Sequence, residues 1–162
     1  MYVYAPAVCD TNVSFFEVQI KPINDNKDII TGSIDDAVFD STLVALTLFR
    51  INESSLKQRY HIHFTDSDMY KIGPSAGLAV YLKLLSLKEC ENSKKMLVTG
   101  EIDLMGNVIE VGGFNGKYLK YANSDEFEYF VAPMANYKMG FKGIYLNTIY
   151  ELNEKVFKNA IQ

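Results

Sequence analysis

Two short glycine-bounded segments contain the side chains best suited to chemistry. The first is Gly73-Pro74-Ser75-Ala76-Gly77, in which small neighbours would let a substrate backbone approach the serine hydroxyl. A helix is predicted to begin here, so free backbone N–H groups can face a developing oxyanion. Ser75 is therefore a candidate nucleophile, although a serine that only caps a helix fits the same five residues.

A serine nucleophile needs a general base, and two kinds of side chain offer one. The chain has only two histidines, His61 and His63, which face the same side of a predicted strand. The alternative is a lysine whose pKa has been lowered by burial, because an ammonium group in a low-dielectric pocket tends to lose its proton. Lys117 follows Gly112-Gly113 and precedes the apolar face of a helix that includes Leu119. Residue types alone leave both bases open.

Turn residues and hydrophobic periodicity predict the elements that position these segments. We expect strands at Ser14–Ile20, Ile29–Ile30, Tyr60–Phe64, Met96–Leu104, Asn107–Val111, Glu128–Ala132 and Ile144–Leu146. Phe16, Val18 and Ile20 alternate with polar residues, so one face of the first of these strands should be buried. The strands at Met96–Leu104 and Asn107–Val111 should turn at Gly106.

Four helices are predicted from capping residues and apolar spacing. They run from a cap at Ser33–Asp36 to about Arg50, from Gly73 to before Glu89, from about Phe114 to Ala122, and from a cap at Thr148 to about Ala160. Helical spacing predicts that four apolar residues of the first helix face the core, namely Phe39, Leu43, Leu46 and Phe49. The second helix should bury Leu78, Tyr81, Leu82 and Leu85. The fourth helix should bury Leu152 and Val156. The mixed order of strands and helices indicates an α+β (mixed α/β) fold, and the length fits one domain over residues 1–162.

Composition excludes several classes of function. With 48% hydrophobic and 22% charged residues the chain should fold, and its net charge of −4, without a basic run, argues against a nucleic-acid partner. The longest apolar runs, such as Leu78–Leu82, are too short to span a membrane, and no signal peptide is visible, so we expect a cytoplasmic protein. Cys9 and Cys90 lack metal-ligand spacing and are expected to be reduced thiols. No metal or cofactor is expected in this chain.

Several segments, in the same order, resemble the proteolytic domain of Lon proteases, and the resemblance extends from about Phe15 to Ile161. They are Ile30-Thr31-Gly32-Ser33 with the following helix that contains Ser41, His61-Ile62-His63-Phe64 with Gly73–Gly77, the hairpin Val98–Val108, and Gly112-Gly113-Phe114-Asn115-Gly116-Lys117. Ordered motifs of this kind are far more specific than any one of them alone.

The resemblance implies the Lon proteolytic-domain fold, with mixed sheets packed against about four helices. It also implies a Ser–Lys dyad with Ser75 as nucleophile and Lys117 as general base. Thr99 matches a threonine that helps to hold the lysine, although a strand threonine often satisfies its hydroxyl locally. His61 and His63 match strand histidines that are not the base, and they are interpreted as shaping the site or as simple packing residues.

This chain departs from the family pattern in three places. Ile72 stands where the family often has an acid, Thr65-Asp66-Ser67 replaces the usual Pro-Glu-Gly, and Asn115 and Gly116 replace charged helix residues. Gly116 also weakens the start of its helix. These changes concern substrate preference and loop gating more than the dyad.

The functional expectation is a serine endopeptidase that acts on protein or peptide substrates. The alternative from another class is a catalytically silent assembly module with the same fold, and a Ser–His hydrolase based on His63 is a third reading. No GxxxxGK[ST] run occurs, so ATP would act only through an absent or separate ATPase module. In a full-length context the resemblance implies a homo-oligomeric ring, usually a hexamer, with an ATPase or unfoldase as a possible partner.

Overall fold

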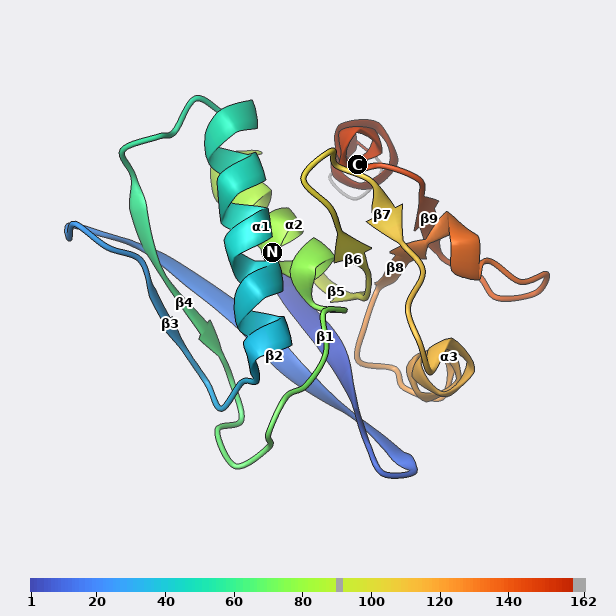
Figure 1. The fold of residues 1–162 in the computed structure, drawn as a ribbon. Coiled ribbons are helices and arrows are strands. Elements are labelled where there is room, and N and C mark those ends of the chain that lie inside the picture. Colours follow the sequence, from blue (N-terminus) through green and yellow to red (C-terminus); the bar gives the residue numbers. More distant parts are fainter. Residues whose placement is uncertain (90–91, 159–162) are drawn as a thin grey trace.

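A mixed sheet forms the centre of the fold (Figure 1). The computed structural model describes residues 1–89 and 92–158, and within these ranges the sheet has seven strands in the order β3-β4-β2-β1-β5-β8-β9. Their bounds are β1 Tyr2–Cys9, β2 Asn12–Ile23, β3 Ile29–Thr31, β4 Arg59–Phe64, β5 Lys95–Val98, β8 Tyr129–Pro133 and β9 Ile144–Leu146. β2 is antiparallel to both β1 and β4, and the other neighbouring pairs are parallel. The predicted mixed α/β fold is therefore confirmed.

The sheet carries helices on both faces. α1 (Asp36–Asn52) and α2 (Gly77–Glu89) pack against each other on one side, and α3 (Phe114–Ala122) lies on the other. Alternate residues of β5 show the division, because Met96 and Val98 join the core under α1 and α2 while Leu97 packs with Phe114 and Tyr118 of α3. As predicted, Phe16, Val18 and Ile20 of β2 are buried.

The beginning and the buried face of α1 differ from the sequence-based prediction. The N-cap is Asp35, whose carboxylate accepts from the Val38 N–H at 2.8 Å, rather than Ser33. Phe39 and Leu43 are exposed, so the prediction was wrong for these two residues. The buried stripe instead includes two polar residues, Ser41 and Thr42. These can enter the core because both hydroxyls donate to the Val38 carbonyl.

The predicted long strand at Met96–Leu104 is divided in the structure. β5 ends at Val98, and a separate two-stranded sheet pairs β6 (Glu101–Ile102) with β7 (Val108–Ile109). The hairpin was predicted correctly, but the chain leaves the main sheet at Thr99-Gly100, where Gly100 has a φ of 159°. This bend is what brings Thr99 to the site described below.

The C-terminal segment forms short helical turns instead of one regular helix. Thr148 is the predicted cap, and it forms a capping box with Glu151. A 3₁₀ turn spans Ile149–Glu151, and a π-helical turn spans Asn153–Phe157. Leu152 and Val156 are buried as predicted. The predicted end near Ala160, like Cys90, lies outside the described residues. In the part of the chain that is described, no helix combines the length and apolar character needed to cross a membrane.

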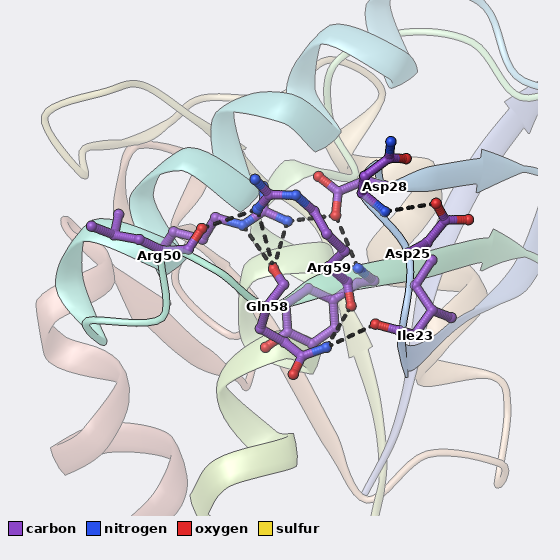
Figure 2. Close-up of polar contacts among 9 residues, drawn as sticks. Ile23, Asp25, Asp28, Arg50, Gln58 and Arg59 are labelled. Atoms are coloured by element: carbon purple, nitrogen blue, oxygen red, sulfur yellow. Dashed lines mark hydrogen bonds and ion pairs between the residues drawn. The ribbon is translucent and has the colours of Figure 1, made fainter.

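A polar cluster fixes the end of α1 to the sheet, as Figure 2 shows. The Arg50 guanidinium pairs with the Asp28 carboxylate and donates to the Gln58 carbonyl at 3.0 and 3.1 Å. Asp28 also accepts from the Tyr60 N–H at 2.9 Å, and the Gln58 amide donates to the Ile23 carbonyl at 3.2 Å. These contacts hold the first residues of β4 in place. The loop that carries Ser75 leaves from the other end of the same strand.

Candidate active site

Ser75 lies in the turn that immediately precedes α2, between the loop after β4 and the first helical residue, Gly77. Its carbonyl accepts from the Gly100 N–H at 2.9 Å, and the Gly100 carbonyl accepts from the Leu78 N–H at 3.0 Å. A side chain at Gly100 would place its Cβ 2.9 Å from a Leu78 methyl carbon and 3.1 Å from Leu78 Cβ, so the absence of a side chain at Gly100 favours this close approach. The serine is thus held directly against the bend between β5 and β6.

Lys117 reaches Ser75 from α3, although 42 positions separate them. The helix begins after Gly113, which has a left-handed φ of 65°, and places Lys117 one turn later, since the Lys117 N–H donates to the Gly113 carbonyl. The side chain is only 4% exposed, and its Nζ lies 3.4 Å from Ser75 Oγ. This is a long hydrogen bond, within reach for proton transfer after a small adjustment.

Burial also changes the acidity of the lysine. Desolvation lowers the pKa of Lys117 from 10.5 to about 8. Its described hydrogen-bond partners are two hydroxyl oxygens, Ser75 Oγ and Thr99 Oγ1, and no carboxylate appears among them. A substantial fraction of the amine can therefore be neutral near pH 8, as a general base requires.

Thr99 is fully buried at the end of β5. Its N–H donates to the Val131 carbonyl of β8 at 3.0 Å, which fixes its backbone. The Thr99 hydroxyl lies 3.5 Å from Lys117 Nζ, at the outer limit of a hydrogen bond. The structure thus brings the Thr99 hydroxyl next to the amine of Lys117.

His61 and His63 lie elsewhere on the sheet. Both ring systems share the hydroxyl of Thr31 on the neighbouring strand β3, with distances of 2.9 Å to His61 Nε2 and 2.7 Å to His63 Nδ1. Among the hydrogen bonds of the described residues, none joins either ring to Ser75 or Lys117. The geometry thus gives the histidines a role in joining β3 to β4.

A cleft of about 490 Å³ opens beside the two candidate catalytic residues. It lies between the tip of the β1–β2 hairpin, the turn before Ser75 and the glycines before α3, and its lining includes Val8, Asp10, Ile72, Ser75, Gly113 and Lys117. Sequence reasoning did not assign the hairpin residues to the site, because only the fold brings β1 beside α3. In the ranges that the structure describes, no cluster of three or more His, Cys, Asp or Glu side chains could hold a metal ion.

Comparison with known proteins identifies the family of this chain. Residues 9–155 match the model of the Lon protease (S16) C-terminal proteolytic domain. The chain belongs to this family. The Lon-type domain is 34% identical to the Lon protease of Endomicrobium trichonymphae over 105 residues, which is 58% of this chain and 13% of that protein. It is 30% identical to the Lon protease of Aster yellows witches'-broom phytoplasma over 119 residues, which is 68% of this chain and 15% of that protein.

A third relative agrees with the first two. The Lon protease of Elusimicrobium minutum is 34% identical over 110 residues, which is 63% of this chain and 13% of that protein. These three matches thus cover between 13% and 15% of the relatives' own length. The Lon-type domain therefore corresponds to a small part of each relative.

Proposed function

We propose that this Lon-type domain is a serine endopeptidase in which Ser75 attacks the peptide carbonyl and Lys117 is the general base. The observation that carries the proposal is the 3.4 Å contact between Lys117 Nζ and Ser75 Oγ, made by a buried lysine whose pKa is lowered to about 8. A neutral amine at this distance can accept the serine proton as the hydroxyl oxygen attacks. The contact also argues against the alternative of a silent assembly module, which would have no need of it.

The first half of the reaction forms an acyl-enzyme. Attack by Ser75 Oγ produces a tetrahedral intermediate and leaves Lys117 as an ammonium, and the Thr99 hydroxyl directs the amine. The neighbouring Gly73 and Gly77 N–H groups already donate to Asp35 and to the Pro74 carbonyl. We assign the oxyanion contacts to the N–H groups of Ser75 and Ala76, which lie between them in the chain.

The second half returns the enzyme to its starting state. The Lys117 ammonium donates a proton to the leaving amine as the C–N bond breaks, which regenerates the neutral base. Water then loses a proton to Lys117 and attacks the ester carbon, and the Ser75 oxygen leaves with a proton from the lysine. Every proton thus passes through one amine, so activity depends on its pKa.

Substrates and assembly follow from the family in the same proposal. We assign unfolded protein or peptide segments as substrates, since an extended chain can enter the open cleft beside Val8 and Ile72. In a longer chain or with a partner, an ATPase module would supply unfolding, and the domain would form a homo-oligomeric ring. Neither ATP nor a metal enters the chemical steps assigned to Ser75 and Lys117.

Hydrolysis of fluorescently labelled casein tests the proposed function. We expect the wild-type chain to release fluorescence at pH 8 to 9, and Ser75→Ala to abolish the release. Ser86→Ala is the matched control, because Ser86 lies in α2, the helix that follows Ser75, and its hydroxyl donates to the Lys83 carbonyl. A properly folded wild-type chain without activity would favour the silent assembly module. Activity retained in Ser75→Ala would assign the chemistry to another residue.

A further inference from the structure

A second buried lysine lies four residues before Ser75. Lys71 is 1% exposed, and its Nζ donates three short hydrogen bonds to backbone carbonyls. The acceptors are Gly32 O at 2.8 Å, Asp66 O at 2.7 Å and Met69 O at 2.8 Å. A neutral amine has only two N–H groups, so three donated bonds require the ammonium form.

The two buried lysines differ in the partners of their amines. Lys117 has two long contacts to hydroxyl oxygens, whereas Lys71 has three short contacts to carbonyl oxygens, and its ammonium also lies 5.6 Å from the centre of the Phe16 ring. Burial lowers the pKa of Lys71, but the Asp66 charge opposes this shift, and bonds to the charged form favour it. Lys71 is therefore suited to hold structure as a cation, and Lys117 to exchange a proton.

The carbonyls that meet at Lys71 come from unusual backbone conformations. Asp66 has a left-handed φ of 63°, and Gly32 has a φ of 125° at a point where a Cβ would lie 2.1 Å from the Phe64 carbonyl oxygen. Such conformations cost free energy and persist only where neighbouring contacts favour them. The Lys71 ammonium supplies such contacts by neutralising the repulsion between three converging carbonyl dipoles.

The same residue fixes the loop between β4 and Ser75 to the start of α1. The Lys71 N–H donates to the Ser33 carbonyl at 2.9 Å, and the Lys71 carbonyl accepts from the Asp35 N–H at 3.0 Å. The Asp35 carboxylate then accepts from the Gly73 N–H at 3.1 Å. The chain of bonds thus runs from Ser33, just after β3, through Lys71 and Asp35 to Gly73, two residues before the nucleophile.

We infer that Lys71 is a positioning residue, whose buried ammonium holds the loop at residues 65–74 so that Ser75 stays within hydrogen-bond reach of Lys117. The inference rests on the proposed function for the role of Ser75. The anchoring of the loop itself can be measured without any activity. The side-chain contacts of Lys71 described above include neither Ser75 nor Lys117, so Lys71 acts through the backbone.

The test compares Lys71→Met and Lys71→Arg with Lys83→Met as the matched control. Lys83 also donates to a backbone carbonyl, that of Met1, at 2.7 Å, but it lies in α2 outside the loop. For a labelled peptide cleaved by the wild type, we expect Lys71→Met to lower kcat by about ten- to a hundred-fold, as misplacement of a reacting group does. KM should change by less than about three-fold, and the midpoint of the pH–rate profile should stay at the wild-type value because Lys117 is intact.

Hydrogen exchange measured by mass spectrometry provides the readout that does not depend on activity. Peptides covering residues 65–74 should exchange faster in Lys71→Met than in wild type, while peptides from α1 and α3 keep their protection. Lys71→Arg should recover part of both the protection and kcat, since a guanidinium can also donate to several carbonyls. Lys83→Met should match wild type in the loop.

Three results would overturn the inference. The first is a folded Lys71→Met chain with the kcat of the wild type. The second is a loss of kcat while hydrogen exchange in residues 65–74 stays unchanged. The third is a shifted midpoint of the pH–rate profile, which would make Lys71 a titrating base. If Lys71→Met does not fold, exchange in the wild type decides. The amides of Met69, Lys71 and Gly73 donate to Asp66 O, Ser33 O and the Asp35 carboxylate, so they must then be protected well above those of an open loop. A wild type without peptidase activity but with the predicted exchange would contradict the proposed function and leave the anchoring role intact.

Discussion

Burial of Lys117 destabilises the folded chain at neutral pH and also prepares the amine to act as a base. The lysine is buried with only two long contacts, so its charged form is less favourable in the folded chain than in water. Its pKa of about 8 lies below the ordinary value of 10.5. Between these two values the unfolded chain binds more protons than the folded one, so the stability contributed by this group rises with pH. Below pH 8 the buried ammonium of Lys117 destabilises the folded chain by its full amount, and this destabilisation disappears as pH approaches 10.5.

Lys117→Met should therefore raise the free energy of unfolding at pH 7. The shift from 10.5 to about 8 corresponds to a gain on the order of 3 kcal/mol, which should fall towards zero near pH 10.5. Urea unfolding of both proteins at pH 7 and pH 10 measures the difference, and the comparison cancels groups that titrate in both chains. If Lys117→Met lowers the free energy of unfolding by the same amount at pH 7 and at pH 10, the buried charge of Lys117 does not destabilise the folded chain.

At the scale of elements, the start of α1 and the nucleophile turn share one carboxylate. Asp35 accepts from the Val38 N–H as the helix cap and from the Gly73 N–H at the end of the loop. Asp35→Asn should keep the cap, since asparagine caps as well as aspartate, but its side chain has only one acceptor oxygen. We expect a melting temperature near that of wild type and a clear loss of kcat.

Two further variants complete this test. Asp35→Ala should lose about 1 kcal/mol of stability as well as activity, because the cap is also removed. Asp36→Ala, in the exposed first turn, should lose only a few tenths of a kcal/mol and keep its activity. Thermal unfolding and peptide cleavage measure both quantities. Full activity in Asp35→Asn would show that the bond to Gly73 does not position Ser75.

Local features explain which elements could be predicted from the sequence. The strand that contains Phe16 and the helix from Phe114 to Ala122 were found because alternation and glycine caps are encoded over a few residues. The exposed positions of Phe39 and Leu43 were missed, since two apolar stripes compete on α1 and only packing against α2 decides between them. Leu119 was likewise expected on a buried face and is exposed.

The site could be predicted in part for the same reason. Ser75 and Lys117 stand in short motifs that an ordered family resemblance identifies, and the fold brings them together. The partners of Lys71 could not be predicted, because three carbonyls meet there only after β3, the loop and α1 are assembled. No pattern of residue types marks such a contact. The cleft wall at Val8 was hidden for a similar reason.

At the scale of the whole molecule, the isolated chain should assemble weakly. The relatives are far longer than this chain, and we propose that the ring expected of such domains needs contacts from regions beyond the matched 13% to 15% of their length. We expect a monomer or a concentration-dependent oligomer in dilute solution. Light scattering over a hundred-fold range of protein concentration measures this. A hexamer that persists unchanged over that range would show that these residues suffice for the ring.

The most direct test of the Ser75–Lys117 dyad is the pH dependence of acylation by a β-lactone, which adds its mass to an activated serine. Intact-mass spectra should show one adduct, located by peptide mapping at Ser75, and its rate of formation should rise with pH around a midpoint near 8, the pKa of Lys117. Lys117→Arg should remove the adduct while the chain stays folded, because a guanidinium remains protonated. An adduct at another residue, or unchanged acylation of Ser75 in folded Lys117→Arg, would contradict the dyad.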